Sequence, residues 1–243
     1  WEGGYQDWTK DFPREFLGRR GYDIRPWMPV LAGKIIASPE LTDRFLWDFR
    51  QTISELIIDK FIRRIQELAS KYKVRFSNEP YGRLCTNNID YADVSDLPMG
   101  EFWTSEDEEF AQFRGSWYNT MKAVASAAHV SGKARVGAEA FTGNRSYRDH
   151  PYKLKGLGDQ AFCQGINHFV LHYSAHQAYD NIKPGLSHAQ WGHHWDRHNT
   201  WFGFTGPWFD YLKRSQYMLQ QGQYVAEVCY FFGEGSPLSM GKG

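Results

Sequence analysis

Val136-Gly137-Ala138-Glu139 is a short apolar run that ends in a carboxylate, and three other runs in the chain repeat this pattern. They are Trp1-Glu2, Phe76-Ser77-Asn78-Glu79 and Phe169-Val170-Leu171-His172, the last of which ends in an imidazole. Parallel strands that each deliver a polar residue at the carboxyl end build the active site of an α/β barrel, because all of those ends meet at one mouth. The pattern therefore predicts parallel strands and one shared cleft.

The composition argues against nucleic acid and membranes as binding partners and is compatible with sugars. The chain has 243 residues, of which 42% are hydrophobic, enough to bury a sizeable core. Lys plus Arg and Asp plus Glu are equal at 28 each, so no positive field favours nucleic acid. No apolar run approaches the roughly 20 residues that span a bilayer, so no membrane partner is expected. Aromatic residues make up 17% of the chain, and their flat faces suit the C–H faces of sugars.

Helices and strands are expected to alternate along the chain. Ser38-Pro39-Glu40 is a helix start, with Ser as the N-cap and Pro at the first helical position. Apolar residues spaced by three and four then predict one long helix over 39–71. Further helices are expected from the capping box at Ser105 to about Gly132, over 157–164 and over 207–221, and strands over 73–77, 134–138, 166–173 and 225–232. Long loops are expected over 1–37, 80–100 and 174–206, the first after a strand end.

This alternation indicates an α/β protein with parallel β/α units. A complete eightfold barrel needs about 250 residues, and the long loops here leave room for only five or six strands. The fold is therefore predicted to be a partial (β/α)8 TIM-type barrel, the C-terminal part of a catalytic barrel with long βα loops. Residues 1–222 are assigned to this partial barrel. Residues 223–243 are either its last strand or the start of a following α/β domain.

Four glutamates are candidate site residues. Glu139 is the strongest, as an acid at a predicted strand tip, with an ion pair to Arg135 or Arg145 as the structural alternative. Glu101 lies between Gly100 and the rings of Phe102 and Trp103, and could instead be an acid near a helix start. Glu79 follows Asn78, and this dipeptide is similar to the acid/base pair of many retaining barrel glycosidases. Glu2 has weak support because it lies at a chain end.

A cluster of histidines suggests zinc, but its spacing does not support that interpretation. The run from His193 to His198 lacks the Glu of a His-Glu-x-x-His site. We expect the histidines to contact sugar hydroxyls or to pack within a loop. Arg197 and Trp201 add a hydrogen-bond donor and a stacking face. The three cysteines are far apart and odd in number, which gives no disulfide framework.

Carboxyl groups in different environments are what glycosidic bond cleavage requires. One protonated carboxyl donates to the leaving oxygen, and one ionised carboxylate activates water or attacks the anomeric carbon. A hard cation such as calcium could also use a carboxylate together with loop oxygens.

Several segments together resemble the bacterial α-L-rhamnosidases of glycoside hydrolase family 106, and the resemblance runs from residue 1 to about residue 234. The segments are Trp1-Glu2 with Trp8-Thr9, Arg19 to Pro29, Ala32-Gly33, Phe45 to Arg50, Met99 to Trp103, Ala138 to Thr142, and Arg197 to Trp201.

The resemblance implies an exo-acting, inverting, calcium-dependent hydrolase that removes terminal α-L-rhamnose from plant polysaccharides or glycosides. By the same resemblance Glu2 is the general acid and Glu139 the general base, while Glu101 is a calcium ligand or an alternative base. The residues expected to bind substrate are Trp103, Glu79, His172, His194, Arg197 and Trp201.

Members of this family are much longer, with further β and sugar-binding domains, so this chain is expected to be part of a longer protein. An extracellular or periplasmic bacterial location is expected, with the signal segment outside this chain. Three alternatives stay open: a retaining glycosidase that uses Glu79 as acid/base, a non-catalytic carbohydrate-binding fragment, and a zinc hydrolase.

Overall fold

The computed structural model of the chain describes residues 8–81, 84–104, 120–143, 147–188 and 191–229. Its elements are α1 (Phe12–Arg20), η1 (Arg25–Trp27), α2 (Met28–Leu31), α3 (Pro39–Leu56), η2 (Ile57–Ile62), α4 (Arg63–Lys71), β1 (Ser77–Asn78), α5 (Asn88–Asp93), β2 (Leu97–Trp103), β3 (Gly137–Thr142), α7 (Pro151–Cys163), β4 (His168–Leu171), η3 (Phe202–Phe204) and α8 (Gly206–Leu219). Residues 120–130 are also helical.

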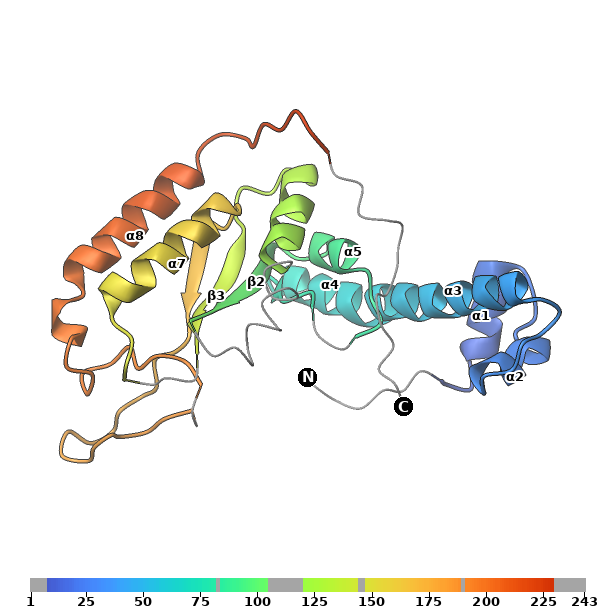
Figure 1. The fold of residues 1–243 in the computed structure, drawn as a ribbon, viewed down its shortest axis with the longest axis horizontal. Helices are drawn as coiled ribbons and strands as arrows, with labels where there is room; N and C mark the ends of the chain where they lie inside the picture. The colour runs from blue at the N-terminus through green and yellow to red at the C-terminus, as the bar shows by residue number, and fades with distance from the viewer. Residues whose placement is uncertain (1–7, 82–83, 105–119, 144–146, 189–190, 230–243) are drawn as a thin grey trace.

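The four strands form one parallel sheet in the order β1-β2-β3-β4, which confirms the predicted α/β class (Figure 1). Neighbours in the sheet are neighbours in the sequence, with helical connections between β2 and β3 and between β3 and β4. This is the arrangement of consecutive strands in a β/α barrel, as expected for part of one.

One face of the sheet packs against helices. Ala138 and Ala140 of β3 join a buried cluster with Phe102, with the helical residues 120–130 and with α7 and α8. Gly100 allows β2 to approach closely, because a Cβ there would lie 3.0 Å from the Cα and N of Met121. Side chains alternate along a strand, so Glu101 and Glu139 leave the opposite face.

The predicted helix over 39–71 is confirmed as one continuous run of α3, the π-helical turn η2 and α4. Ser38 caps it as predicted, since its side chain accepts a hydrogen bond from the backbone N–H of Leu41. Residues 8–37 contain α1, η1 and α2, so the loop predicted over 1–37 is wrong for this part. Apolar side chains of α1 pack on α3, with Phe12 and Phe49 ring centroids 5.4 Å apart.

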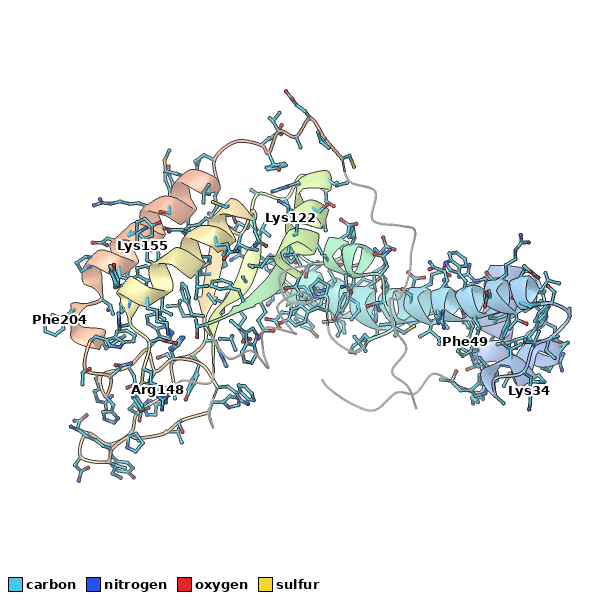
Figure 2. The ribbon with its side chains drawn as sticks, in the orientation of Figure 1. Lys34, Phe49, Lys122, Arg148, Lys155 and Phe204 are labelled. Carbon is cyan, nitrogen blue, oxygen red and sulfur yellow. The ribbon has the colours of Figure 1, made fainter. Side chains whose placement is uncertain are left out.

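These N-terminal helices lie at the end of α3 that is farthest from the sheet (Figure 1). Figure 2 shows Phe49 on this part of α3 and Lys34 at the tip of the helical group. The group has a buried cluster of its own, made by Phe12, Phe16, Ile24, Val30, Phe45, Phe49, Ile53 and Cys85.

Several strand boundaries differ from those predicted. The strand predicted over 73–77 begins only at Ser77, and the predicted loop over 80–100 contains α5 and most of β2. β3 begins at Gly137 and continues to Thr142, so Glu139 lies within the strand and not at its tip. Residues 225–229 are exposed and form no strand. Residues 230–232 of that prediction lie outside the described residues.

Among the described residues, no helix combines the length and the apolar character that a bilayer crossing requires. Cys163 and Cys229 are exposed, and Cys85 is buried.

Candidate active site

Four polar side chains leave one face of the sheet near the carboxyl ends of the four strands. Glu79 directly follows β1, Glu101 lies on β2, Glu139 lies on β3, and His172 directly follows β4. The strand register pairs Glu101 with Glu139, and Glu139 in turn with Val170. His172 lies two residues beyond Val170 and so on the same face. The structure thus brings together four of the predicted site residues.

Tyr81 joins two of these carboxyl groups. Its hydroxyl lies 2.7 Å from Glu101 Oε2 and 2.8 Å from Glu79 Oε2. A tyrosine hydroxyl has one hydrogen, so it can donate to one carboxylate only, and the second short contact requires a proton from the other carboxyl group. The three side chains therefore hold at least one carboxyl proton between them when both contacts are made.

Burial makes both of these carboxyl groups harder to ionise. Glu101 is 6% exposed. Desolvation raises the pKa of Glu101 to about 8; the hydrogen bond from Tyr81 opposes this shift, while the nearby charges of Glu139 and Glu79 add to it. Desolvation also raises the pKa of Glu79, and the charge of Glu139 adds to the effect. At neutral pH the Glu101 carboxyl is thus mostly neutral, and the Glu79 carboxyl is harder to ionise than an exposed one.

Glu139 has a more polar and more open environment. Its side chain is 26% exposed, and its Oε1 lies 3.5 Å from His172 Nδ1. The Thr142 hydroxyl donates a hydrogen bond to the same oxygen. The alternative ion pair with Arg135 is not among the described contacts of Glu139, and Arg145 lies outside the described residues.

A β-bulge places Thr142 beside Glu139. The register between β2 and β3 shifts from Glu101 opposite Glu139 to Trp103 opposite Thr142, so β3 contains one extra residue. Phe141 has a φ of 61° at this point. The extra residue turns Thr142 to the face that carries Glu139, which regular alternation would not do.

Aromatic side chains border the carboxyl cluster at the end of β2. The rings of Trp103 and Trp191 meet edge to face with centroids 5.3 Å apart. The segment that carries Trp191 is held by backbone hydrogen bonds, from Gly192 N to Gly143 O at 2.6 Å and from His193 N to His172 O at 2.9 Å. Trp103 is therefore placed where it could contact a sugar ring bound beside Glu101.

His194 lies within a neighbouring group of rings. It stacks on Tyr147 with centroids 4.1 Å apart, and Tyr173 lies between His194 and His172, 5.5 Å and 5.3 Å away. Desolvation lowers the pKa of His194, which favours the neutral imidazole. The adjacent His193 is fully buried, with Nε2 3.1 Å from Thr104 Oγ1 and 3.8 Å from Asp149 Oδ2.

Arg197 and Trp201 lie in the long loop after β4, and none of their described contacts is with the carboxyl cluster. Arg197 forms an ion pair with Asp180 at 2.6 Å and donates to the backbone oxygen of Gln177. Trp201 packs edge to face on the buried Trp195, with centroids 5.3 Å apart. A hollow of about 450 Å³ lies in this loop, lined by His176, Arg197 and Phe202 among others, and of the described glutamates neither Glu79, Glu101 nor Glu139 lines it.

The described residues alone do not make a metal site. No three of their acidic, imidazole or thiol side chains are grouped closely enough to hold an ion. Calcium takes six to eight oxygen ligands, so a site that uses Glu101 would need oxygens from elsewhere. Glu2 and the capping box that begins at Ser105 lie outside the described residues.

Sequence reasoning missed Tyr81 and Thr142. Tyr81 lies only two residues after Glu79, but its contact with Glu101 spans 20 residues and depends on the pairing of β1 with β2. Thr142 reaches Glu139 only through the bulge. The Glu79-x-Tyr81 spacing at a strand end was the one signal available for the first, and no signal indicated the second.

Comparison with known proteins identifies related sequences over nearly the whole chain. The model of a family described as alpha-L-rhamnosidase, glycoside hydrolase family 106, matches residues 1–241. A protein of Formosa agariphila named "Putative beta-glucuronidase" is 39% identical over 237 residues, which are 98% of this chain and 20% of that protein. The solved structure of a rhamnosidase from Novosphingobium sp. PP1Y matches with a TM-score of 0.85 and 33% identity, over 95% of this chain and 22% of that one. This chain spans about a fifth of the length of these two relatives.

Proposed function

This chain belongs to glycoside hydrolase family 106, the α-L-rhamnosidases, and we propose that it carries the carboxyl groups that hydrolyse a terminal α-L-rhamnoside. The observation that carries the proposal is the convergence of Glu79, Glu101 and Glu139 on one face of the sheet. They differ in burial and in hydrogen bonding, and burial raises the pKa of Glu101 and of Glu79. Different environments are the condition for dividing acid and base roles between carboxyl groups.

Glu139 is the proposed general base. A base must be able to reach a water molecule, which the partial exposure of Glu139 supports, and the Thr142 hydrogen bond orients its carboxyl group. Glu139 would remove a proton from water as that water attacks the anomeric carbon, and the bond to the leaving oxygen would break. Glu2 is the proposed general acid on the strength of the family resemblance, and would give its proton to that leaving oxygen.

The environment of Glu101 supports a neutral role more than a basic one. A carboxyl with a pKa of about 8 is mostly protonated at pH 7, so it can donate a hydrogen bond to a substrate hydroxyl. We therefore place Glu101 beside the sugar as a hydrogen-bonding group. Trp103, Glu79, His172 and His194 are the proposed surroundings of the sugar, while Arg197 and Trp201, in the loop after β4, are proposed to contact the rest of the substrate.

Inversion of the anomeric carbon is proposed together with a retaining alternative. In an inverting enzyme the acid and base stand roughly 6.5 to 9.5 Å apart, and in a retaining enzyme about 5 to 5.5 Å. The retaining alternative uses Glu79 as acid/base. The position of Glu79 beside Glu101, with Tyr81 between them, supports this alternative. Proton NMR of the first sugar released distinguishes them: β-L-rhamnose indicates inversion, and α-L-rhamnose indicates retention.

Calcium, plant polysaccharides or glycosides as substrates and an extracellular or periplasmic location stay predictions that rest on the family resemblance. When bound, calcium would supply a positive charge that orients sugar hydroxyls. Chelation followed by readdition of calcium tests the dependence: loss and recovery of activity supports it, and unchanged activity contradicts it.

The activity itself is tested with the protein that carries this chain and two chromogenic substrates, an aryl α-L-rhamnoside and an aryl β-D-glucuronide. The second is included because of the name of the Formosa agariphila relative. Hydrolysis of the rhamnoside alone is the expected result. Hydrolysis of the glucuronide alone would show that the substrate is a β-D-glucuronide and not a rhamnoside. Rhamnose binding by calorimetry without turnover of either substrate would favour a non-catalytic carbohydrate-binding role.

A further inference from the structure

The Tyr81 hydroxyl is the described contact that joins the first strand of the sheet to the second within the carboxyl cluster. Tyr81 lies three residues after the end of β1, and its hydroxyl reaches Glu79 Oε2 at 2.8 Å and Glu101 Oε2 at 2.7 Å. Both distances are those of strong hydrogen bonds to a carboxyl group. One hydroxyl thus bridges two acidic side chains from different strands.

The sheet register explains why a bridge is needed there. Asn78 pairs with Pro98, so Glu79 stands at the level of Met99, while Glu101 lies two residues further along β2. Two residues along a strand amount to about 6.6 Å. The two carboxyl groups therefore start from different levels of the sheet, and the hydroxyl between them fixes how far each reaches toward the other.

Glu101 is also the register partner of Glu139, so its position affects the proposed base. A carboxyl group that moved on β2 would change the space and the charge beside Glu139 on the adjacent strand. Catalytic groups lose rate steeply when they are displaced, on the order of 10²-fold for about 1 Å. A residue that holds Glu101 in place can thus influence the rate without touching the substrate.

We propose that Tyr81 is a positioning residue, whose hydroxyl joins Glu79 to Glu101 and so sets the place of the Glu101 carboxyl beside Glu139. The inference rests on the proposed function and adds to it a residue that neither the family resemblance nor the sequence motifs indicated. Tyr81 acts through the two glutamates and does not itself take part in bond breaking.

A kinetic double-mutant cycle tests this role. Tyr81→Phe keeps the ring and removes the bridge, and we expect kcat on the aryl rhamnoside to fall roughly 10- to 100-fold with KM changed less than about threefold. Because the bridge requires both partners, adding Tyr81→Phe to Glu79→Leu, which leaves no polar atom to bond the hydroxyl, should cost much less than it costs in the parent protein. Independent, multiplying effects of the two changes would overturn the proposal.

Tyr22→Phe is the matched control. The Tyr22 hydroxyl also donates to a carboxylate, Asp48 Oδ2, at 3.0 Å, but it lies in the N-terminal helical group far from the sheet. The change should leave kcat and KM as they are. An equal loss of kcat in Tyr22→Phe and Tyr81→Phe would show a general stability effect and would contradict a positioning role.

Unfolding measurements separate failure of this inference from failure of the proposed function. The same cycle of Tyr81→Phe and Glu79→Leu, followed by urea unfolding at pH 7, should also show coupling, whatever the substrate is. Coupling in stability without rhamnoside turnover in the parent would reject the proposed function and keep the bridge. Additivity in stability would reject the bridge even if the parent hydrolyses the rhamnoside.

Discussion

Glu101 and Glu139 are register partners on the neighbouring parallel strands β2 and β3, so the two side chains leave the same face of the sheet at the same level. Adjacent strands are about 4.8 Å apart, which places two acids side by side. Glu101 is buried and is contacted by a tyrosine hydroxyl, whereas Glu139 is partly exposed and faces an imidazole. This difference in environment is what allows two identical side chains to have different roles.

The stability of the protein should depend on the ionisation of Glu101. Its pKa is raised to about 8 in the folded protein from the ordinary glutamate value of 4.5, so the unfolded chain loses this proton more easily. The contribution of the neutral carboxyl to the free energy of unfolding is fully present below about pH 4.5 and is lost as the pH rises through about 8. The glutamine of Glu101→Gln cannot ionise. The unfolding free energy of this variant minus that of the parent should therefore increase across this window, by up to about 1.4 kcal/mol per pH unit.

Urea unfolding of both proteins between pH 5 and about pH 9 provides the check. A difference in unfolding free energy that stays flat over this range would mean that Glu101 ionises as an ordinary surface glutamate does. The raised pKa, and with it the neutral role proposed for Glu101, would then be wrong.

Thr142→Val should reduce activity more than stability. Valine matches the shape of threonine but cannot donate the hydrogen bond that Glu139 Oε1 accepts. Without this donor to orient Glu139, kcat on the aryl rhamnoside should fall roughly 10- to 100-fold, which corresponds to about 1.4 to 2.7 kcal/mol in the barrier. Thr205→Val is the control, because the hydroxyl of Thr205, just before α8, donates at 2.7 Å to the backbone oxygen of Phe202 in η3. Full activity of Thr142→Val would remove Thr142 from the site.

Gly100→Ala should destabilise the protein. The added Cβ would lie 3.0 Å from the backbone of Met121, so β2 and the helical residues 120–130 would have to separate. Overpacking of this kind typically costs about 1 to 3 kcal/mol. In Gly156→Ala, within α7, the added Cβ meets nothing within 4 Å, and the change should stabilise by about 0.4 to 1 kcal/mol. Chemical unfolding of both variants measures the contrast, and equal stabilities would contradict the close packing of β2 on the helix.

The long helix with a regular apolar spacing was predictable from sequence, whereas short elements such as α1 and β2 were not. The spacing of Phe45, Phe49 and Ile53 predicted the long helix, and Ser38 before Pro39 predicted its N-cap. The α1 helix was missed because glycine, proline and arginine interrupt any apolar period between residues 12 and 20. β2 was missed because Pro98 and Gly100 indicate a loop locally, whereas in the sheet the glycine allows the close approach of a helix.

The members of the site were easier to predict than their arrangement. An acid after an apolar run predicts a strand end, which holds for Glu79 after β1 but not for Glu139, which lies within β3. Glu101 was indicated by its aromatic neighbours. Tyr81, Thr142 and the burial of Glu101 depend on which strands pair, on their register and on a bulge. None of these is encoded in a local pattern, so a single sequence could not reveal them.

The rate of Glu139→Gln on an aryl α-L-rhamnoside tests the central claim most directly. Glu67→Gln is its control, since Glu67 is an exposed acid on α4 that pairs with Arg64. Loss of a general base typically costs on the order of 10² to 10⁴ in rate. The account predicts such a loss of kcat for Glu139→Gln, while its unfolding free energy stays equal to that of the parent protein. Glu67→Gln should be fully active. Full activity of Glu139→Gln in a protein that hydrolyses the rhamnoside would contradict it.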